Sequence, residues 1–387
     1  MALLLATLPW IAFLGFIPLL YRRRPRLRDY GPATDGPLVS IVVPARNEAS
    51  HIVWCLRTLL RTRYRNYEVI VVDDRSEDGT GEILSALVER GVENVRVVTG
   101  EALPEGWFGK PWACWQGYRH ARGELLLFTD ADTRHEPDLL GHAVAAMEAA
   151  GVDLVTVLPR QVLASFWERL VMPQFLVAIM LRYGSARRIG RARNPLDVIA
   201  NGQFILMRRE AYEAIGGHEG VRGEVAEDLR LAQRTVAAGR RMLIAHAEEL
   251  MSTRMYASLR EILDGWSKNV ATGGRQTVPR WLRPALPYLV AAWFLLMWVA
   301  PPVALAVALM LDAPSSDLVV GWSAAATAAS VLFWLLAYAR YGVLRIHVLL
   351  YPLAALVAAF IFARSGWRGR RIEWKGRRYG VTAPIRR

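Results

Sequence analysis

Between about residues 36 and 282, short apolar runs alternate with stretches of helical character. The expected strands cover residues 39–44, 67–72, 94–98, 124–129 and 153–158, and the clearest expected helix covers residues 49–60. Continuous apolar strands that alternate with helices indicate a parallel sheet with helices on both faces. The pattern therefore predicts an α/β domain whose sheet is mostly parallel.

Long apolar segments flank this region on both sides. The first covers residues 2–20 and is followed by an arginine-rich run at residues 22–28. A secretory signal has its positive charges before the apolar stretch, so we expect an uncleaved anchor with its C-terminal flank in the cytoplasm. Three later segments, residues 284–311, 318–338 and 343–363, are each long enough to span about 30 Å of hydrocarbon.

These segments predict a multi-pass protein of the cell membrane with four parts. The expected parts are an N-terminal membrane anchor (1–21), a cytoplasmic domain (36–282), C-terminal membrane segments (284–363) and a basic tail (364–387). Four crossings would place the basic tail on the side opposite the domain, against the positive-inside tendency. A segment that does not cross would remove the conflict. Segment 284–311, which contains Pro301 and Pro302, is the first candidate, although the sequence does not decide it.

Composition and charge indicate which class of partner the protein binds. The chain is 53% apolar and carries a formal net charge of +13, most of it in clusters beside the apolar segments. Because no nucleic-acid-binding motif accompanies that charge, we expect a membrane partner and no nucleic acid. Cys55 and Cys114 have neither metal-ligand nor redox spacing, which fits packing residues in a reducing compartment.

Polar clusters follow three of the expected strands, at residues 45–48, 73–74 and 130–132. Ligands of parallel sheets bind at the carboxyl ends of the strands. Asp130 and Asp132 are two carboxylates at i and i+2 after a buried strand, so they can hold a hard divalent cation that bridges to a diphosphate. Asp228 opens a later helical stretch and can serve as a general base. Each cluster alone could instead be a turn former or a helix cap.

The ordered set of motifs resembles the family-2 glycosyltransferases with the A-type nucleotide-sugar fold. The matching segments are residues 42–48, 71–80, 109–110, 130–132, 202–212, 215–217 and 227–228. The likeness covers roughly residues 38 to 270, about two thirds of the chain. The arrangement of membrane segments is similar to the lipid-glycosylating branch, which includes ceramide, hopanoid-associated and carotenoid glycosyltransferases.

The resemblance implies a role for individual residues. The implied donor-binding residues are Pro44, Ala45, Glu48, Asp74, Lys110 and Asp130, with Asp74 facing the base and Lys110 meeting the phosphates. Asp132, with Asp130, would hold Mg²⁺ or Mn²⁺. Asp228 would remove the proton from the acceptor hydroxyl while that oxygen attacks the anomeric carbon with inversion.

Three features leave alternatives open. Many relatives carry a Gln/Arg-x-x-Arg-Trp motif after the base, whereas this chain has Trp266 and Lys268 in that region. These two residues would contact the donor or would belong to an amphipathic helix on the bilayer. Residues 166–181 would form the wall of a lipid entrance or an ordinary core helix. Residues 374–377 of the tail would reach back to the domain or would anchor to lipid headgroups.

The sequence therefore predicts a membrane-integral glycosyltransferase. It would move one sugar from a nucleotide-diphosphate donor, expected to be UDP-linked, to the hydroxyl of a membrane lipid. A polyprenyl-phosphate sugar transferase is the alternative within the same class. A non-catalytic scaffold that only binds nucleotide sugar is the alternative from another class.

Overall fold

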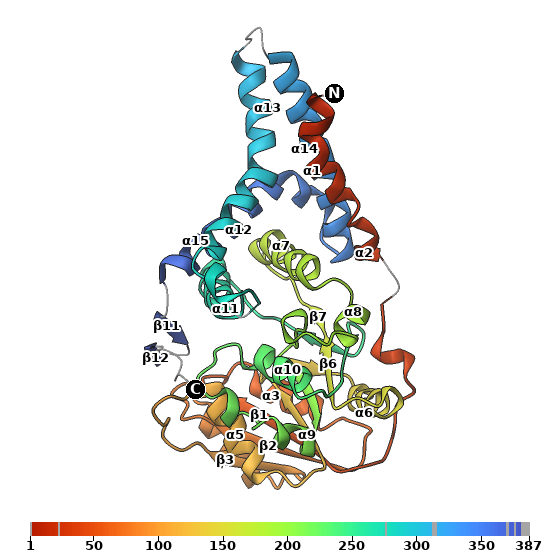
Figure 1. Cartoon of the computed structure of the whole chain (residues 1–387). Helices are drawn as coiled ribbons and strands as arrows, with labels where there is room; N and C mark the ends of the chain where they lie inside the picture. Colours follow the sequence, from red (N-terminus) through yellow and green to blue (C-terminus); the bar gives the residue numbers. More distant parts are fainter. Residues whose placement is uncertain are drawn as a thin grey trace. The chain divides into compact units, whose positions relative to one another are not determined.

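The computed structural model describes the chain except for residues 1, 22–23, 275–276, 312–315, 369–370, 375–376 and 381–387 (Figure 1). The chain forms two compact units. The helical unit contains Met1–Arg23, Leu163–Gly184 and Tyr256–Gly369. The sheet unit contains Arg24–Val162, Ser185–Met255 and Arg370–Arg387. The domain boundaries inferred from the sequence stay a prediction.

A seven-stranded sheet forms the centre of the sheet unit, in the order β3-β2-β1-β4-β8-β6-β9. Its strands are β1 (Val39–Ala45), β2 (Tyr67–Asp73), β3 (Val95–Thr99), β4 (Leu125–Thr129), β6 (Leu154–Leu158), β8 (Phe204–Arg208) and β9 (Met242–His246). Only β8 runs antiparallel to its neighbours, β4 and β6. The predicted α/β class with a mostly parallel sheet is therefore confirmed, and β8 and β9 are strands that the pattern did not identify.

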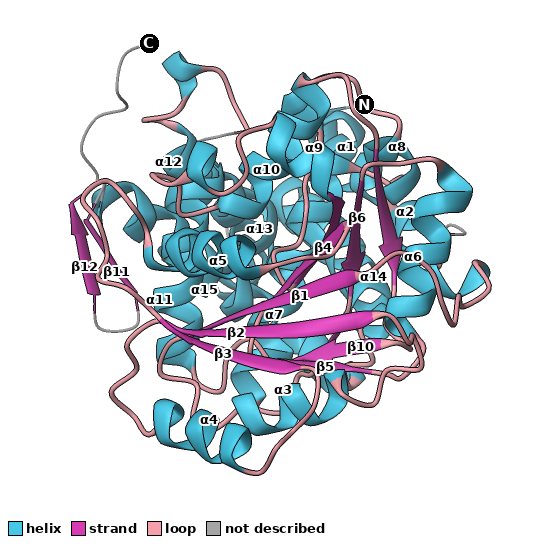
Figure 2. Ribbon diagram, turned by 90° about the horizontal axis from the view of Figure 1, so that it is seen from below, coloured by secondary structure: helices cyan, strands magenta, loops and turns pink. Residues whose placement is uncertain are grey.

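Helices cover both faces of this sheet (Figure 2). The helices of this unit are α3 (Ile52–Leu59), α4 (Thr80–Glu89), α5 (Gly109–His120), α6 (Leu139–Ala150), α8 (Ala186–Gly190), α9 (Arg209–Ala214) and α10 (Glu227–Ala237). The main core joins α3, α4 and α6 to one face, whereas Ala113 of α5 packs on Ile70 and Val72 of the other. Gly117 lets α5 approach closely, because a Cβ there would lie 2.3 Å from Val42 Cγ1.

Two smaller sheets complete the sheet unit. One contains β5 (Thr133–His135), β10 (Met251–Thr253) and β7 (Arg160–Gln161). The other is an antiparallel hairpin near the C-terminus, built from β11 (Arg371–Trp374) and β12 (Arg377–Gly380). We call residues 371–380 the tail hairpin, of which residues 375–376 lie outside the described part. The tail hairpin thus belongs to the sheet unit although about a hundred residues of the helical unit precede it.

The helical unit contains α1 (Ala2–Leu14), α2 (Ile17–Tyr21), α7 (Phe166–Tyr183), α11 (Leu259–Asn269), α12 (Leu286–Phe294), α13 (Ala300–Leu311), α14 (Ser316–Arg340) and α15 (Tyr351–Arg368). Among the described residues, three continuous helical stretches are long and apolar enough to cross a membrane: Leu286–Met310, Asp317–Arg340 and Arg345–Trp367. They correspond to the three C-terminal segments expected from the sequence. The N-terminal segment is divided by a turn at Gly15 and Phe16, and its crossing stays a prediction.

Pro301 and Pro302 do not end the first of these stretches. A π-helical segment, Leu295–Val299, precedes them and joins α12 to α13. Proline has no N–H to donate, and its ring clashes with the carbonyl group four residues earlier, so a wider turn accommodates it. α14 then packs along α13 and α1, and Trp10 of α1 donates from Nε1 to the Met297 carbonyl at 2.7 Å.

Candidate active site

The loops after β1 and β2 are joined by hydrogen bonds at the carboxyl edge of the sheet. The Asp74 N–H donates to the Ala45 carbonyl at 2.8 Å, and the Glu48 N–H donates to Thr80 Oγ1 at 2.9 Å. Asn47 adopts a left-handed backbone with φ of 53°, a conformation that asparagine tolerates better than most residues. The sheet thus brings together four predicted donor-binding residues: Pro44, Ala45, Glu48 and Asp74.

Asp74 is buried in this edge and is paired with the tail hairpin. Arg377 donates from Nη1 to Asp74 Oδ2 at 2.5 Å and from Nη2 to Oδ1 at 3.1 Å. Arg46 donates to the main-chain carbonyl of Asp74 at 2.8 Å. Burial raises the pKa of Asp74 above its ordinary value, although Arg377 and Arg46 act in the opposite direction. Of the tail residues expected to reach back or to bind headgroups, Arg377 contacts the sheet unit, and Lys375 and Gly376 lie outside the described residues.

A second cluster lies where β4 ends, and Lys110 is at its centre. Lys110 is the second residue of α5, and its Nζ lies 2.7 Å from Asp130 Oδ1 and 2.9 Å from Glu227 Oε1. Burial alone would lower the pKa of Lys110, but the charges of Asp130, Glu227 and Asp228 outweigh it and raise that pKa well above the ordinary value. The ammonium group therefore stays charged and binds the carboxylates together.

Asp228 is held by main-chain donors in the first turn of α10. Its Oδ2 accepts from the Gly202 N–H at 2.9 Å, and its Oδ1 accepts from the Leu229 N–H at 2.7 Å. Gly202 keeps this corner open, because a Cβ there would lie 3.0 Å from both Asp228 Oδ2 and Lys110 Nζ. Burial raises the pKa of Asp228, while the charge of Lys110 and the two N–H donors oppose the rise.

The cluster contains more carboxyl groups than ammonium groups. Three carboxylates, those of Asp130, Glu227 and Asp228, surround the single ammonium of Lys110. Burial raises the pKa of Glu227 as well, with the nearby charge of Asp228 contributing and Lys110 opposing. A buried group of this composition favours the approach of a further cation, since uncompensated buried charge is costly.

Asp130 and Asp132 fit a divalent cation that is shared with a substrate. They flank Ala131 in the turn between β4 and β5, and both are half-buried. Within the described residues, no group of three or more His, Cys, Asp or Glu side chains could hold a metal ion by itself. Mg²⁺ commonly binds one or two carboxylates and completes its shell with phosphate oxygens and water. The oxygen donors present therefore fit a cation completed by a diphosphate.

Trp266 and Lys268 lie on α11 in the helical unit. Trp266 is 8% exposed, stacks on Phe175 with ring centroids 4.2 Å apart, and donates from Nε1 to Met172 Sδ at 3.2 Å. These contacts pack α11 on α7. The expected donor contacts of Trp266 and Lys268 stay a prediction.

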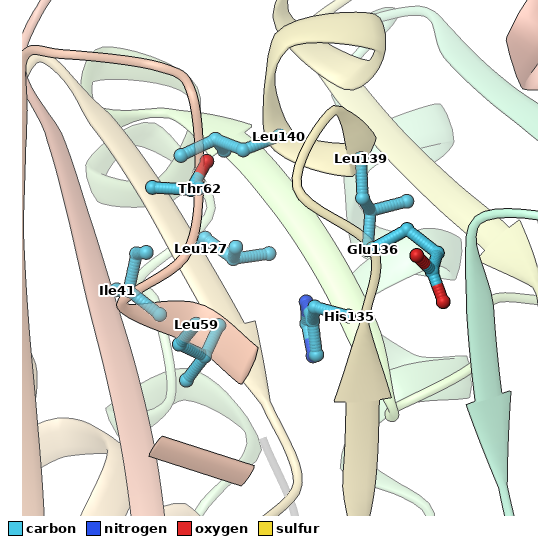
Figure 3. Close-up of a pocket in the computed structure, with 8 residues that line it drawn as sticks. All are labelled: Ile41, Leu59, Thr62, Leu127, His135, Glu136, Leu139 and Leu140. Carbon is cyan, nitrogen blue, oxygen red and sulfur yellow. The ribbon is translucent and has the colours of Figure 1, made fainter. Parts of the chain in front are cut away.

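A small cavity in the sheet unit belongs to the core (Figure 3). The residues that line it come from both the sheet and the helices that cover it: Ile41, Leu59, Thr62, Leu127, His135, Glu136, Leu139 and Leu140. Burial lowers the pKa of His135 to about 3, so this imidazole is neutral at physiological pH. The mostly apolar lining indicates packing of the core and not a substrate site.

Comparison with known proteins identifies the family. Residues 40–216, which include β1 to β4 and most of the edge just described, match the family description "Glycosyl transferase family 2". Residues 40–216 therefore form a family-2 glycosyltransferase domain. This domain confirms the predicted enzyme class, a glycosyltransferase, and a nucleotide-sugar donor.

Known relatives extend the likeness beyond this domain. The glycosyltransferase is 24% identical over 372 residues to the 4,4'-diaponeurosporenoate glycosyltransferase of Staphylococcus aureus strain MRSA252, with 94% of each chain covered. The protein of the same description from strain N315 is 23% identical over the same length. The mannosyltransferase PcManGT from Pyrobaculum calidifontis, solved with GDP-Man and Mn²⁺, superposes with a TM-score of 0.52 and 22% identity. That likeness covers 91% of this chain and 99% of the other, which confirms the expected fold.

Proposed function

We propose that this glycosyltransferase moves one sugar from a UDP-linked donor to the hydroxyl of a membrane lipid, with inversion and with a divalent cation. The observation that carries the proposal is the buried cluster of Lys110, Asp130, Glu227 and Asp228 at the carboxyl end of β4. It places a fixed ammonium, hard oxygen ligands and a carboxylate held by two N–H donors beside one another. These are the groups that a transfer from a nucleotide diphosphate needs.

The donor would lie along the carboxyl edge of the sheet. Asp74, beside Pro44 and Ala45, would accept a hydrogen bond from the base, and Glu48 would line the same nucleoside pocket. The diphosphate would reach toward β4, where Asp130 and Asp132 would hold Mg²⁺ or Mn²⁺. When bound, this cation neutralises the charge that develops on the departing diphosphate. The Mn²⁺ in the mannosyltransferase PcManGT supports this assignment.

Asp228 would act as the general base. The hydroxyl proton of the acceptor passes to the Asp228 carboxylate as the acceptor oxygen forms its bond to the anomeric carbon. The bond between that carbon and the diphosphate breaks, and its electron pair leaves with the nucleotide. Direct attack on the side opposite the leaving group inverts the anomeric configuration. Gly202 and Leu229 orient the carboxylate through their N–H groups.

Lys110 would organise the site from within. Its ammonium contacts both Asp130 and Glu227, so it fixes a metal-binding carboxylate relative to the start of α10. That arrangement would keep Asp228 on α10 at a fixed position relative to the end of β4. A lysine held between two carboxylates in this way is a positioning residue, and its expected contact with the donor phosphates stays a proposal.

The lipid acceptor and the membrane location are supported by the helical unit and by the relatives. Three apolar stretches are long enough to cross a bilayer, and the Staphylococcus aureus relatives are named for glycosylation of diaponeurosporenoate. The sheet unit would lie in the cytoplasm, where nucleotide sugars are made. The arginine-rich run at residues 22–28 favours the same side.

Turnover by the purified protein tests the proposal. The full chain in detergent micelles, supplied with radiolabelled UDP-sugars and a membrane lipid extract, should produce labelled lipid, and a chelator should stop it. Labelled lipid that forms equally well in excess chelator would refute the requirement for a divalent cation. Donor binding without any transfer would indicate instead a non-catalytic scaffold that binds nucleotide sugar. Transfer only to polyprenyl phosphate would refute the proposal that the acceptor group is a lipid hydroxyl.

A further inference from the structure

The tail hairpin contributes an arginine to the edge of the sheet that binds the nucleoside in the proposed function. Arg377 is the first residue of β12, and its guanidinium meets both carboxylate oxygens of Asp74. The Asp74 side chain is 2% exposed and that of Arg377 is 17% exposed. A two-point contact between a planar guanidinium and a carboxylate has both strength and a defined orientation. This pair is therefore unlike an exposed surface ion pair.

The other charged groups near Asp74 do not replace this contact. Arg46 donates to the main-chain carbonyl groups of Asp74 and Arg75, at 2.8 and 2.6 Å, and forms an ion pair with Glu77. Asp73 adds a like charge beside the carboxylate. Among the described residues, Arg377 donates two hydrogen bonds to the Asp74 carboxylate oxygens themselves.

We propose that Arg377 is a specificity-determining residue of the nucleoside site, which it serves by fixing Asp74 as an ionised and oriented acceptor for an N–H group of the donor base. A carboxylate has about four acceptor positions, so the two that Arg377 occupies leave others for the base. A protonated Asp74 would lose one acceptor oxygen to its own proton. The tail hairpin is then part of the donor site. This inference rests on the proposed function, which places Asp74 at the base.

Nucleotide binding as a function of pH tests the role of Arg377. Arg377→Gln removes the charge and the paired donors, so the Kd for UDP should rise about 10-fold to 100-fold. In this variant the charge of Arg46 still lowers the pKa of Asp74, but the contribution of Arg377 is lost. The pKa of Asp74 therefore rises further. UDP binding by Arg377→Gln should therefore weaken more steeply than binding by the wild type as the pH falls through the raised pKa of Asp74. Calorimetry of the full chain in detergent measures both effects.

Two further variants separate this role from a structural one. Arg377→Lys keeps the charge and loses the paired geometry, so it should bind UDP with intermediate affinity and with little pH dependence. Arg90→Gln removes the same charge from an exposed residue at the C-terminal end of α4 and should bind as the wild type does. If Arg377→Gln binds UDP with wild-type affinity and with the pH profile of the wild type, the inference about Arg377 is wrong and the proposed function is unaffected. A wild-type protein that binds neither UDP nor GDP would overturn the proposed function together with it.

A separate observation within the helical unit concerns the path of the chain through the membrane. The segment that directly precedes α15, Arg345–Leu350, packs on α14 and on α7, where the rings of Phe166 and His347 lie 5.8 Å apart. α15 ends beside α11, through an ion pair of 2.6 Å between Arg364 and Asp264. Its Gly366 also lies against Tyr288 near the start of α12, since a Cβ there would be 2.7 Å from the ring. The C-terminal part of α15 is thus held by α11 and the start of α12, and α7 packs on both α15 and the segment before it.

The helices that hold α15 are connected directly to the sheet unit. α7 lies between Val162 and Ser185, which both belong to that unit, so the chain leaves the sheet unit before α7 and returns to it after α7. α11 begins four residues after Met255, the last residue of the middle segment of the sheet unit. α15 therefore packs on the two helices, α7 and α11, that are joined in sequence to segments of the sheet unit.

We infer that α15 does not cross the membrane and that α12–α13 and α14 cross it as an antiparallel pair. Two crossings return the chain to the side of the sheet unit, which agrees with the position of the tail hairpin in that unit. The basic tail then follows the positive-inside tendency. The most apolar part of the stretch Arg345–Trp367, which contains α15, is 44% buried, against 28% for each of the other two stretches. This stretch therefore has less surface available to lipid. The segment with the two prolines, the first candidate from the sequence, is thereby assigned a crossing.

Labelling of single cysteines with a membrane-impermeant maleimide tests this path in intact cells. Asp317→Cys, at the exposed start of α14, should react from outside. A cysteine added after Arg387 should react only after permeabilisation, as should the control Arg61→Cys in the sheet unit. Cys55 and Cys114 are buried and can be replaced by alanine to remove background. Reaction of the C-terminal cysteine in intact cells, or no reaction at position 317, would overturn the inference.

Discussion

Substitution of the proposed base is the most direct test of the active site. Asp228→Asn keeps the size of the side chain and removes its ability to accept a proton. Both carboxylate oxygens accept main-chain N–H groups, from Gly202 at 2.9 Å and from Leu229 at 2.7 Å. The amide oxygen of asparagine can keep one of these hydrogen bonds, while its NH₂ group must face the other donor. We therefore expect a local change within an intact α10.

The rate and the stability should respond very differently. Loss of a general base typically lowers the rate by about 10² to 10⁴, equivalent to about 3 to 5 kcal/mol of transition-state free energy. The loss should fall on kcat and leave the donor Kd nearly unchanged, because the proton moves only during the transfer. If Asp228 served only as a helix-terminal charge, its removal would lower the free energy of unfolding by about 0.3 to 1 kcal/mol and leave kcat intact.

Glu227→Gln is the matched control at the adjacent position. Glu227 is buried and contacts Lys110 Nζ at 2.9 Å, so its neutral variant weakens a buried ion pair. We expect it to lower the free energy of unfolding by about 1 to 3 kcal/mol, with a smaller effect on kcat than Asp228→Asn. The variant should therefore be mild in rate and larger in its effect on stability.

Single-turnover rates, calorimetric donor affinity and melting temperature in detergent separate the two roles. The pH dependence adds a further check, because burial raises the pKa of Asp228 and only the ionised carboxylate can accept the proton. Wild-type activity should therefore decline as the pH falls through that raised pKa. An Asp228→Asn enzyme with wild-type kcat and a slightly lower melting temperature would refute the assignment of the base.

Three further outcomes are expected. Asp132→Asn should weaken UDP binding in the presence of Mg²⁺ or Mn²⁺ and have little effect in chelator, as calorimetry with and without metal can show. Gly202→Ala should lower kcat with little change in melting temperature, because its Cβ would lie 3.0 Å from the Lys110 and Asp228 side chains. His135→Gln should flatten the decline of melting temperature at acid pH. The pKa of His135 falls from 6.5 to about 3 on folding, so the unfolded chain gains a proton first and stability is lost as the pH falls from 6.5 to 3. At pH 5 that loss is about 2 kcal/mol, and an unchanged pH dependence in the variant would contradict this origin.

The pattern of the sequence predicted the strands that are buried on both faces. β1, β2 and β4 are continuous apolar runs because helices cover both sides of them, and such runs are visible without any long-range information. β8 was recognised as part of a motif but not as a strand, since antiparallel pairing with β4 and β6 leaves no separate signal in so short a run. β9 is equally short and directly follows Arg240 and Arg241.

The candidate residues of the site were visible for a similar reason, but their partners were not. Asp130 and Asp132 follow a strand, and Asp228 opens a helix, so local pattern alone marks their positions at the edge of the sheet. The ion pair of Lys110 with Glu227 and the contact of Arg377 with Asp74 depend on how distant segments fold together. The second of these joins residues 303 positions apart.

The tail shows how one stretch of basic sequence can serve two purposes. Net charge and position favoured contact with lipid headgroups, and that interpretation needs only that the arginines lie near the membrane surface. The Arg377 contact requires more, because a guanidinium must reach a nearly buried carboxylate in the sheet unit. Both conditions are met if the tail returns to the side of the sheet unit, which two crossings achieve and three do not. The path of the chain through the membrane and the composition of the nucleoside site are therefore linked, because a tail on the side of the membrane opposite the sheet unit would be incompatible with the Arg377–Asp74 pair.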